Sequence, residues 1–238
     1  MATRISQQQR LVAVRSTQLG GSASFQASRE IIDLARARAA ELLEAVVEDI
    51  IFEATIGFHV AGVPTRALDW SEIGELSTQT NYKATGAGTF AFGACVAVVE
   101  IDTETAAVTV RQLVCVDDAG TILNPMIVEG QVHGGLGLAI GACLTEEMIY
   151  DENGTPLTSN FADYGLVSSA ETISFEAHEM ETPSPMNPLG VKGIGESGTV
   201  IATQPSNRQS STLKPFGVKH LDFPFTAERV WQATQSPK

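Results

Sequence analysis

Hydrophobic residues recur at steps of three and four along the first long patterned segment of the chain. Ile31, Leu34, Ala35 and Leu43 mark this stripe, and charged residues fill the remaining faces. A period near 3.6 residues is typical of an amphipathic helix. The pattern predicts a helix over Ser24–Val47.

Two short apolar runs follow in "DIIFEATIGFHVAGVPTRAL", punctuated by Gly57 and by Gly62-Val63-Pro64. Short runs bounded by turn residues predict short strands. The next stretch, "DWSEIGEL", predicts a small helix capped by Asp69 or Ser71, because their side-chain oxygens can accept the first free helical N–H groups. A polar, glycine-rich connector then separates this part from the rest.

The middle of the chain predicts an antiparallel strand pair and a long helix. "FGACVAVVEID" and "AAVTVRQLVCVDD" are rich in β-branched residues and are joined by a short polar turn. In "NPMIVEGQVHGGLGLAIGACL", Asn124 suits the cap and Pro125 the first helical turn. Glycine costs about 1 kcal/mol against alanine inside a helix, so we expect something to approach this backbone closely. The glycines are Gly130, Gly134, Gly135, Gly137 and Gly141.

The last third predicts a hairpin, a strand and a long loop. "EEMIYDENGTPLTS" has Asn153-Gly154 for a tight turn with positive φ values, and "TISFEAHEME" resembles a strand. The loop "TPSPMNPLGVKGIGESGT" ends where a helix begins. Helices and hairpins in this order predict an α+β fold, with a cofactor-contacting helix and small αβ segment over residues 1–80 and a second segment over 81–238.

Composition narrows the classes of partner. The 238 residues carry a formal net charge of -13, which argues against nucleic acid, because such partners need clustered Lys and Arg. Cys95, Cys115 and Cys143 lack CxxC spacing and lie among apolar residues, so we expect buried free thiols. We find no signal peptide and no uninterrupted apolar run near the roughly 20 residues of a membrane span. The expected location is the cytoplasm.

The stretch "GVKGIGESGT", residues 190–199, holds four glycines and one glutamate, Glu196. Glycines can direct several N–H groups at one point before a helix, which favours an anion cradle, although a mobile surface turn fits the same residues. Glu196 is placed where a general base could be held, or where an acid simply interacts with the helix dipole. Asp117 and Asp118 are better explained as caps of a turn, and His133 as a structural histidine; the histidines show no metal-ligand spacing.

Four stretches together resemble the C-terminal part of the molybdopterin-binding large subunit of the xanthine dehydrogenase and carbon monoxide dehydrogenase family. They are "RSTQLGGSA" at 15–23, "FGACVAVVEIDTETAAVTVRQLVCVDDAGTILNPMIVEGQVHGG" at 92–135, "DENGTPLTSNFADYGL" at 151–166 and "ETPSPMNPLGVKGIGESGT" at 181–199. They cover most of the chain in the family's order.

The resemblance implies oxidative hydroxylation of an electron-poor carbon, in an aldehyde, an N-heterocycle or carbon monoxide, at a molybdenum-molybdopterin cytosine dinucleotide cofactor. Glu196 matches the family's general base, a carboxylate that must be desolvated near the metal. The implied cofactor-binding residues are Arg15, Ser16, Thr17, Gln18, Gln131, Lys192, Gly193 and Gly195. The resemblance implies as partners a medium subunit that binds FAD, a small subunit with 2Fe-2S clusters and the missing N-terminal half of the large subunit, in a hetero-oligomer.

The sequence departs from the family in two places. The family's large subunits are much longer, so the chain could instead be a non-catalytic remnant that keeps the fold and a partner surface. After Thr203, "TQPSNRQSST" lacks the family's amphipathic helix. Read from the third base of codon 203, suitable synonymous codons spell Pro-Ala-Ile-Gln-Ser-Ala-Val-Val-Asp-Ala, which is helical in character. We therefore hypothesise a local frame displacement over residues 203–213.

Overall fold

The computed structural model describes residues 15–84, 88–203 and 210–235, and the chain divides into two compact units. The first unit comprises residues 1–87 with 185–189, and the second comprises residues 88–184 with 190–238. The division along the chain therefore falls seven residues beyond the predicted boundary at 80/81. Helices accompany two separate three-stranded sheets, which confirms the α+β class.

The first unit packs one long helix against a small antiparallel sheet. A π-helical turn, η1 (Ser16–Gly21), runs into α1 (Ser22–Leu43), and a 3-10 turn, η2 (Val47–Asp49), leads to the sheet. Its strands, in the order β1-β2-β3, are β1 (Ile50–Glu53), β2 (Gly57–Val60) and β3 (Ala67–Leu68). The short helix α2 (Trp70–Ile73) closes the unit. The predicted short strands and small helix are thus confirmed.

Helix α1 begins two residues before the predicted start and ends four residues before the predicted end. Ala35, Ala39 and Leu43 are buried against Ile50 and Phe58, whereas Leu34 of the predicted stripe is exposed, so only part of that stripe is the core face. Glu44 adopts a left-handed conformation with φ 54°, and the helix stops there. At the start of α2, Asp69 accepts hydrogen bonds from Ser71 N and Glu72 N at 2.7 and 3.2 Å, which identifies Asp69 as the cap.

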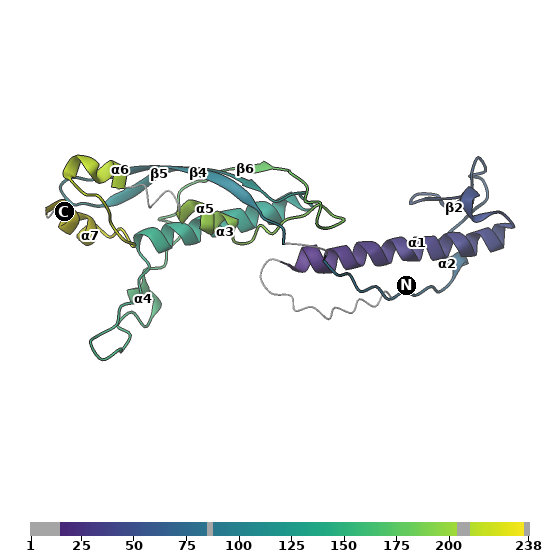
Figure 1. Ribbon diagram of the computed structural model, residues 1–238, viewed down its shortest axis with the longest axis horizontal. Coiled ribbons are helices and arrows are strands. Elements are labelled where there is room, and N and C mark those ends of the chain that lie inside the picture. Colours follow the sequence, from purple (N-terminus) through teal and green to yellow (C-terminus); the bar gives the residue numbers. More distant parts are fainter. Residues whose placement is uncertain (1–14, 85–87, 204–209, 236–238) are drawn as a thin grey trace. The chain divides into compact units, whose positions relative to one another are not determined.

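The second unit is a three-stranded sheet with helices on one face (Figure 1). Strand β4 (Phe92–Ile101) pairs antiparallel with β5 (Val108–Asp118), as predicted, and β5 pairs parallel with β6 (Glu176–Met180). The helices are α3 (Pro125–Leu144), α4 (Phe161–Tyr164), α5 (Ser197–Thr203), α6 (Ser210–Leu213) and α7 (Ala227–Gln235), with a 3-10 turn, η4 (Lys214–Phe216).

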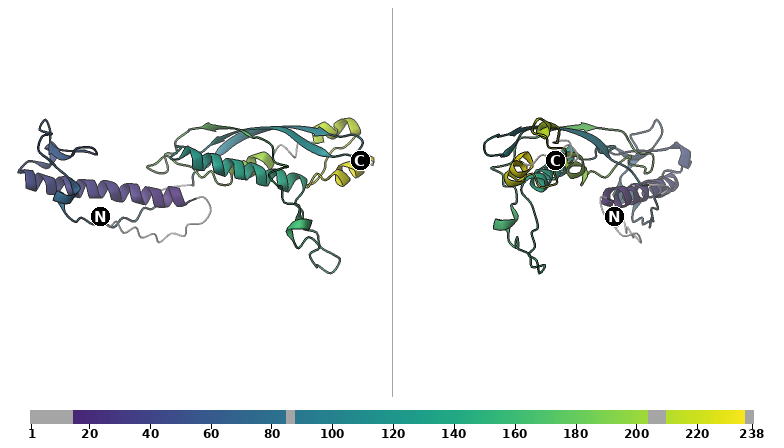
Figure 2. Two further views of the ribbon diagram at one scale, coloured as in Figure 1. Left: turned by 180° about the vertical axis from the view of Figure 1, so that it is seen from behind. Right: turned by 60° about the vertical axis from the view of Figure 1, so that its left-hand side comes forward.

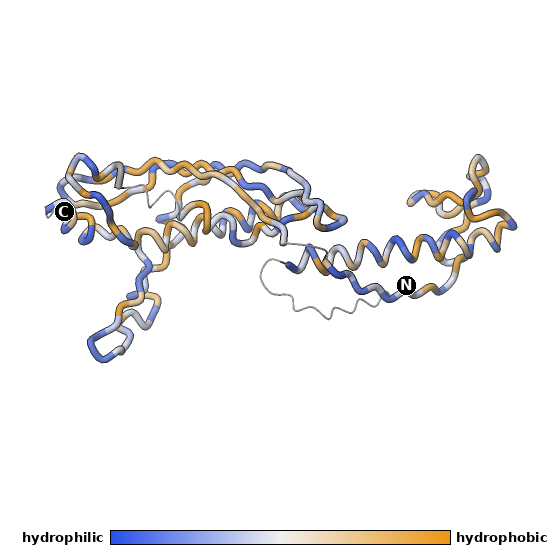
Figure 3. The backbone as a smooth tube through the Cα atoms, viewed as in Figure 1, coloured by the Kyte–Doolittle hydropathy of each residue, from blue (hydrophilic) through white to orange (hydrophobic). Residues whose placement is uncertain are grey.

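Helices α3 and α5 lie side by side beneath the strands, and the views from behind and from the side agree (Figure 2). Leu113 and Cys115 of β5 pack with Val132, Leu136 and Ile140 of α3 in one apolar cluster. The hydropathy colouring shows the same apolar band along α3 and the central strands (Figure 3). The opposite face of the sheet carries Val96 and Val98, which are exposed.

Helix α3 is long and apolar enough to cross a membrane when judged by length and composition alone. Polar residues such as Glu129 interrupt its apolar run, so the sequence reading did not single it out. The core helix of a soluble protein satisfies the same two measures, and the buried residues of α3 pack on its own sheet. Length and composition alone do not show that α3 crosses a membrane. Asn124 caps the helix as predicted, with its side chain accepting from Ile127 N at 3.2 Å.

The predicted hairpin at residues 146–159 is only partly formed. A single bridge joins Tyr150 and Pro156, and only Gly154 of the turn has a positive φ, 82°. The carboxylate of Asp151 accepts from Asn153 N and Thr155 N, both at 2.8 Å, and closes the turn. The prediction of positive φ was therefore wrong for Asn153: Gly154 N donates to Asp151 O at 3.0 Å, and the Asp151 carboxylate adds its own bonds to the same turn.

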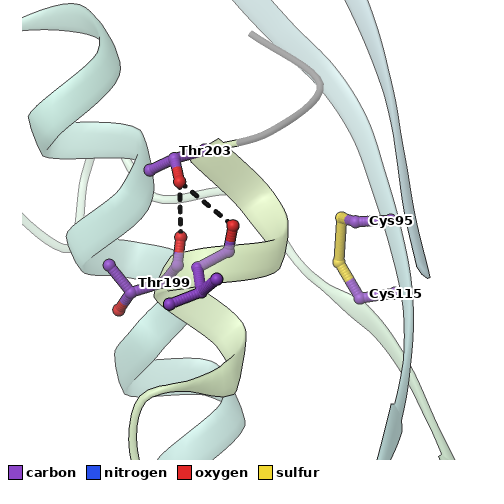
Figure 4. The surroundings of a disulfide bond; sticks show 5 residues. Cys95, Cys115, Thr199 and Thr203 are labelled. Carbon is purple, nitrogen blue, oxygen red and sulfur yellow. Dashed lines mark hydrogen bonds between the residues drawn. A yellow bond between two sulfur atoms is a disulfide. The ribbon is translucent and has the colours of Figure 1, made fainter. Parts of the chain in front are cut away.

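Two of the three cysteines form a disulfide, which corrects the expectation of three free thiols. Cys95 and Cys115 are opposite each other in the β4–β5 register, with their Cα atoms 4.2 Å apart. Their sulfurs lie on the face of the sheet that α5 covers (Figure 4). Spacing along the chain could not show this pairing, because it depends on strand register. Cys143 is buried and is not part of this disulfide, as expected.

Candidate functional site

The loop that carries Glu196 is fastened to the end of β5 by its backbone. Lys192 N donates to Ala119 O at 2.8 Å, and Thr121 N donates to Gly190 O at 3.0 Å. Gly120 and Gly190 have φ of 68° and 69°, and a Cβ at Gly120 would lie 3.0 Å from Lys192 N. The two glycines therefore let two loops cross closely. Of the two interpretations left open, the mobile turn does not fit this part of the loop.

Lys192 makes a buried ion pair with Asp118. Its Nζ lies 2.6 Å from Asp118 Oδ2 and 2.7 Å from Thr182 Oγ1, and it stands 4.7 Å from the centre of the Phe92 ring. The side chains of Lys192 and Asp118 are 9% and 1% exposed. The ammonium is thus engaged within the loop's own support, and its predicted contact with a cofactor remains a prediction.

Asp118 is the centre of this support. Burial raises the pKa of its carboxyl group, but hydrogen bonds from Lys192, Thr182 and Gly120 together outweigh burial and lower the pKa to about 2. Gly120 N donates to Asp118 Oδ1 at 2.8 Å, so the predicted turn-capping role of Asp118 is confirmed. The sequence reading missed the ion pair because 74 residues separate its partners.

Helix α5 begins in close backbone contact with α3. A Cβ at Gly135 would lie 2.9 Å from Thr199 N, and a Cβ at Gly198 would lie 2.8 Å from Val132 O. Thr199 Oγ1 also donates to Gly135 O at 3.1 Å. The expected close approach to the α3 backbone is therefore confirmed at Gly135, where the approaching group is a helix of the same unit. At Gly141 the side chain of Glu146 fills the same kind of space.

Three other glycines of α3 have nothing from the described chain against them. A Cβ at Gly130, Gly134 or Gly137 would meet no described atom within 4 Å. Their spacing of four and three residues places them on one side of the helix. Gln131 adjoins this side, is exposed, and makes no side-chain hydrogen bond among the described residues. This glycine face, defined as Gly130, Gly134 and Gly137, leaves room for a flat molecule beside an amide.

Glu196 is two residues before Gly198, at the point where α5 crosses α3. Because Gly198 touches Val132 O, the chain positions of Glu196 and Gln131 are brought to the same crossing. The Glu196 side chain is exposed and has no hydrogen-bond or ion-pair partner among the described residues. Gly193 and Gly195 are half-buried in the same loop. The shielding from water that a desolvated base needs is therefore not supplied by the described part of this chain.

The remaining predicted cofactor residues, Arg15, Ser16, Thr17 and Gln18, belong to the first unit. Arg15 precedes the π-helical turn η1, and Leu19 N donates to Arg15 O at 2.9 Å. Arg15, Ser16 and Thr17 are exposed and Gln18 is half-buried. π-Helical turns are rare and occur often at functional sites, so the backbone here is unusual at the predicted place.

Two histidines discounted in the sequence lie at one hollow of about 300 Å³ between α3 and β6. His133 and His178 line it together with Glu129 and Glu179. The His133 ring is tilted against Phe175, with ring centres 5.6 Å apart. Within residues 15–84, 88–203 and 210–235, no three His, Cys, Asp or Glu side chains are grouped as a metal site would need.

The chain is similar to a known protein family and to several known enzyme subunits. Residues 3–173 match the family described as molybdopterin cofactor-binding domain. The carbon monoxide dehydrogenase large chain of Afipia carboxidovorans is 34% identical over 231 residues, covering 92% of this chain and 28% of that protein. The nicotine 6-hydroxylase large subunit of Paenarthrobacter nicotinovorans is 32% identical, with coverages of 94% and 29%.

A solved structure shows the same arrangement of elements. The structure of quinoline 2-oxidoreductase from Pseudomonas putida 86 superposes with a TM-score of 0.81 and 32% identity, covering 95% of this chain and 31% of that one. The chain thus spans less than a third of the length of the proteins that it resembles.

Proposed function

Because the chain belongs to the molybdopterin cofactor-binding family of xanthine dehydrogenase and carbon monoxide dehydrogenase large subunits, we propose that it is the C-terminal part of a molybdenum hydroxylase large subunit. The proposed reaction is oxidative hydroxylation of an electron-poor carbon. The substrates named in the relatives, carbon monoxide, nicotine and quinoline, support this class without selecting one member. One observation carries the proposal: α5 packs closely on α3 just after Glu196, and neither the Glu196 carboxylate nor the Gln131 amide has a hydrogen-bond partner among the described residues.

The residues of the second unit fit a flat pterin ring system. Gln131 offers an amide donor and acceptor, and the glycine face lets a ring approach the helix backbone where any side chain would intrude. In the first unit, Arg15, Ser16 and Thr17 present exposed donors of the kind that suit a phosphate. We propose these as the pterin and nucleotide contacts, with molybdopterin cytosine dinucleotide as the bound form.

When bound, the cofactor would supply the two-electron oxidation and the oxygen that enters the product. Glu196 would accept a proton on its carboxylate oxygen, for which the carboxylate must be ionised when substrate arrives. It has no hydrogen-bond or ion-pair partner among the described residues, which leaves it available for this role. The ion pair of Lys192 with Asp118 and the backbone bonds at Ala119 and Gly190 would hold the loop in place while the proton moves.

We further propose that the active protein needs the polypeptide that corresponds to the rest of the relatives' length, in a cytoplasmic complex with FAD and 2Fe-2S subunits. That polypeptide and the cofactor would cover Glu196, which the described chain leaves exposed. The competing proposal is a non-catalytic remnant. The exposure of Glu196 favours it, because a general base in this role needs shielding from water.

Metal content and turnover decide between the two. The chain would be co-expressed with a large-subunit segment covering the missing length and with the electron-transfer subunits. Elemental analysis should find molybdenum, and an artificial dye should be reduced with an aldehyde, an N-heterocycle or carbon monoxide. A matched variant, Gly134→Ala, should fold but retain less molybdenum, because its methyl group would occupy the glycine face. A folded complex without molybdenum would favour the remnant.

A further inference from the structure

Asp117 is a buried carboxyl group without a partner. It is 2% exposed, and neither of its oxygens receives a hydrogen bond among the described residues. Its neighbour Asp118 receives several hydrogen bonds on the opposite side of β5. Placing an unpaired carboxylate ion in such surroundings is costly, whereas a neutral carboxylic acid is tolerated if its O–H finds an acceptor.

The groups around Asp117 offer no positive charge. On β4 its register partner is Gly93, where a Cβ would lie 3.3 Å from Asp117 Oδ1 and 2.5 Å from Ile201 Cδ1. On β6 the register partner is Glu179, an exposed acid. Helix α5 carries no charged residue, and Glu196 precedes it. Asp117 makes no ion pair with α3 among the described residues. The titratable residues of that helix are Glu129, His133 and Cys143.

Ser197 is the candidate acceptor, because its hydroxyl is the side-chain group that acts on the pKa of Asp117. Its hydroxyl donates to Ile194 O at 3.1 Å, and Ser197 N donates to the same carbonyl at 3.2 Å. A hydroxyl has one proton and two lone pairs, so Ser197 Oγ in this arrangement can only accept a further bond. Burial raises the pKa of Asp117, and the nearby Ser197 hydroxyl lowers it by a smaller amount. The net effect raises the pKa of the carboxyl group, and its protonated form is the one able to donate.

We propose that Asp117 is a positioning residue whose neutral carboxyl group donates to Ser197 Oγ, which in turn donates to Ile194 O. Ile194 and Ser197 flank Glu196 on either side, so this hydrogen-bond chain ties both ends of the Glu196 turn to β5. Ionised Asp117 could take part only if Ser197 turned its hydroxyl proton away from Ile194 O, which would leave the turn held by the backbone bond from Ser197 N alone. The effect on turnover rests on the proposed role of Glu196, whereas the hydrogen-bond chain does not.

Two substitutions at Asp117 test whether its carboxyl group acts as a neutral hydrogen-bond donor or only fills space. In Asp117→Asn the amide N–H₂ can still donate to Ser197, whereas Asp117→Val removes the donor at similar volume. We expect amide exchange at Ser197 and Val200 to be unchanged in Asp117→Asn and about tenfold faster in Asp117→Val, the effect of one lost hydrogen bond. Asp33→Val, on the exposed side of α1, is the control and should leave this exchange unchanged.

Stability against pH gives a second readout that needs no cofactor. Because the folded pKa of Asp117 is raised, its contribution is fully present below the unfolded pKa of about 4 and is lost as pH rises toward the folded pKa. Asp117→Asn does not titrate, so its stability relative to wild type should increase as pH rises above the unfolded pKa of about 4. If Asp117→Asn loses protection at the loop as Asp117→Val does, or if neither variant changes it, the proposal is overturned.

In the assembled complex, Asp117→Val should lower kcat with little change in KM, and Asp117→Asn should restore kcat. If the complex holds no molybdenum, the exchange and stability results still decide the role of Asp117, so failure of the proposed function is distinguishable. If exchange follows the prediction and kcat is the same in both variants, the hydrogen-bond chain stands but the positioning role is overturned.

Discussion

Two neighbouring carboxyl groups at the end of β5 meet opposite surroundings. Asp118 faces a lysine, a threonine and a backbone N–H, and is held ionised. Asp117 lies near Gly93, Ile201 and Ser197. The Ser197 hydroxyl already donates its hydrogen bond to Ile194 O. Successive residues of a strand point to opposite faces. The loop with Lys192 therefore acts on the pKa of Asp118, and the start of α5 acts on the pKa of Asp117.

The first prediction at the residue scale concerns Lys192. Lys192→Met keeps most of the aliphatic stem but leaves Asp118 buried without its cation, and we expect a loss of about 3–5 kcal/mol in the free energy of unfolding. Urea denaturation measures it, with Lys219→Met, an exposed site, as the matched control. A variant as stable as wild type would mean that the Lys192 ammonium does not support the loop.

Acid sensitivity of the Asp118 ion pair is the second prediction. The folded pKa of about 2 lies below the unfolded value, so the group contributes stability above pH of about 4 and loses it as pH falls toward 2. The shift corresponds to about 2 kcal/mol. The stability difference between wild type and Asp118→Asn should therefore shrink by this amount between pH of about 5 and about 2. A difference independent of pH would show that Asp118 is not held ionised by its partners.

Glu196 gives the third prediction. In the assembled complex, Glu196→Gln should keep its molybdenum and its fold, because the side chain has no internal partner among the described residues. Turnover should fall by roughly 10² to 10⁴, the usual contribution of a general base. Dye-reduction kinetics and elemental analysis on the same preparation test both parts. Unchanged turnover would remove Glu196 from the mechanism.

At the scale of elements, the contact between α3 and α5 places Glu196. A Cβ at Gly135 would press on the backbone of Gly198 and Thr199, and backbone atoms cannot rotate out of the way as a side chain can. The short helix behind the glutamate is therefore held by α3 on one side and by Gly93 and Asp117 of the sheet on the other. Thr203, at the end of α5, also bonds back to Thr199 O at 3.0 Å (Figure 4).

Paired glycine substitutions test this contact. Gly135→Ala should lower the free energy of unfolding by roughly 1–3 kcal/mol, as overpacking against backbone does. Gly137→Ala, where a Cβ meets open space, should raise it by about 0.5–1 kcal/mol, because alanine stabilises a helix. Thermal or urea unfolding of the two variants gives the comparison. Equal effects would mean that α5 does not pack on Gly135.

At the scale of the whole molecule, the segment after α5 is one of the two places where we expect the sequence to depart from the family. Residues 204–209 lie outside the described residues, so the frame displacement hypothesised over 203–213 stays a hypothesis. Downstream, Leu213, Val218, Phe225 and Val230 form a buried cluster, which fits the return to a family-like sequence.

Sequencing the DNA of codons 203–213 tests the displacement directly, and an unambiguous in-frame read would end the idea. A chain carrying Pro-Ala-Ile-Gln-Ser-Ala-Val-Val-Asp-Ala in this segment should be more stable, because each aliphatic side chain that becomes buried adds about 1.5–3 kcal/mol. Unfolding of the two chains in urea provides the comparison.

The sequence by itself determined the elements whose signals are local. The period of α1, the cap of α2 by Asp69, the β4–β5 pair and the cap of α3 by Asn124 follow from residues within a few positions of one another. The family resemblance likewise singled out Glu196 and Gln131. Tertiary structure decided what depends on distant residues: the Cys95–Cys115 disulfide, the Lys192–Asp118 ion pair and the unpartnered carboxyl of Asp117. Burial and hydrogen-bond partners are properties of the packed chain, so spacing along a sequence cannot specify them.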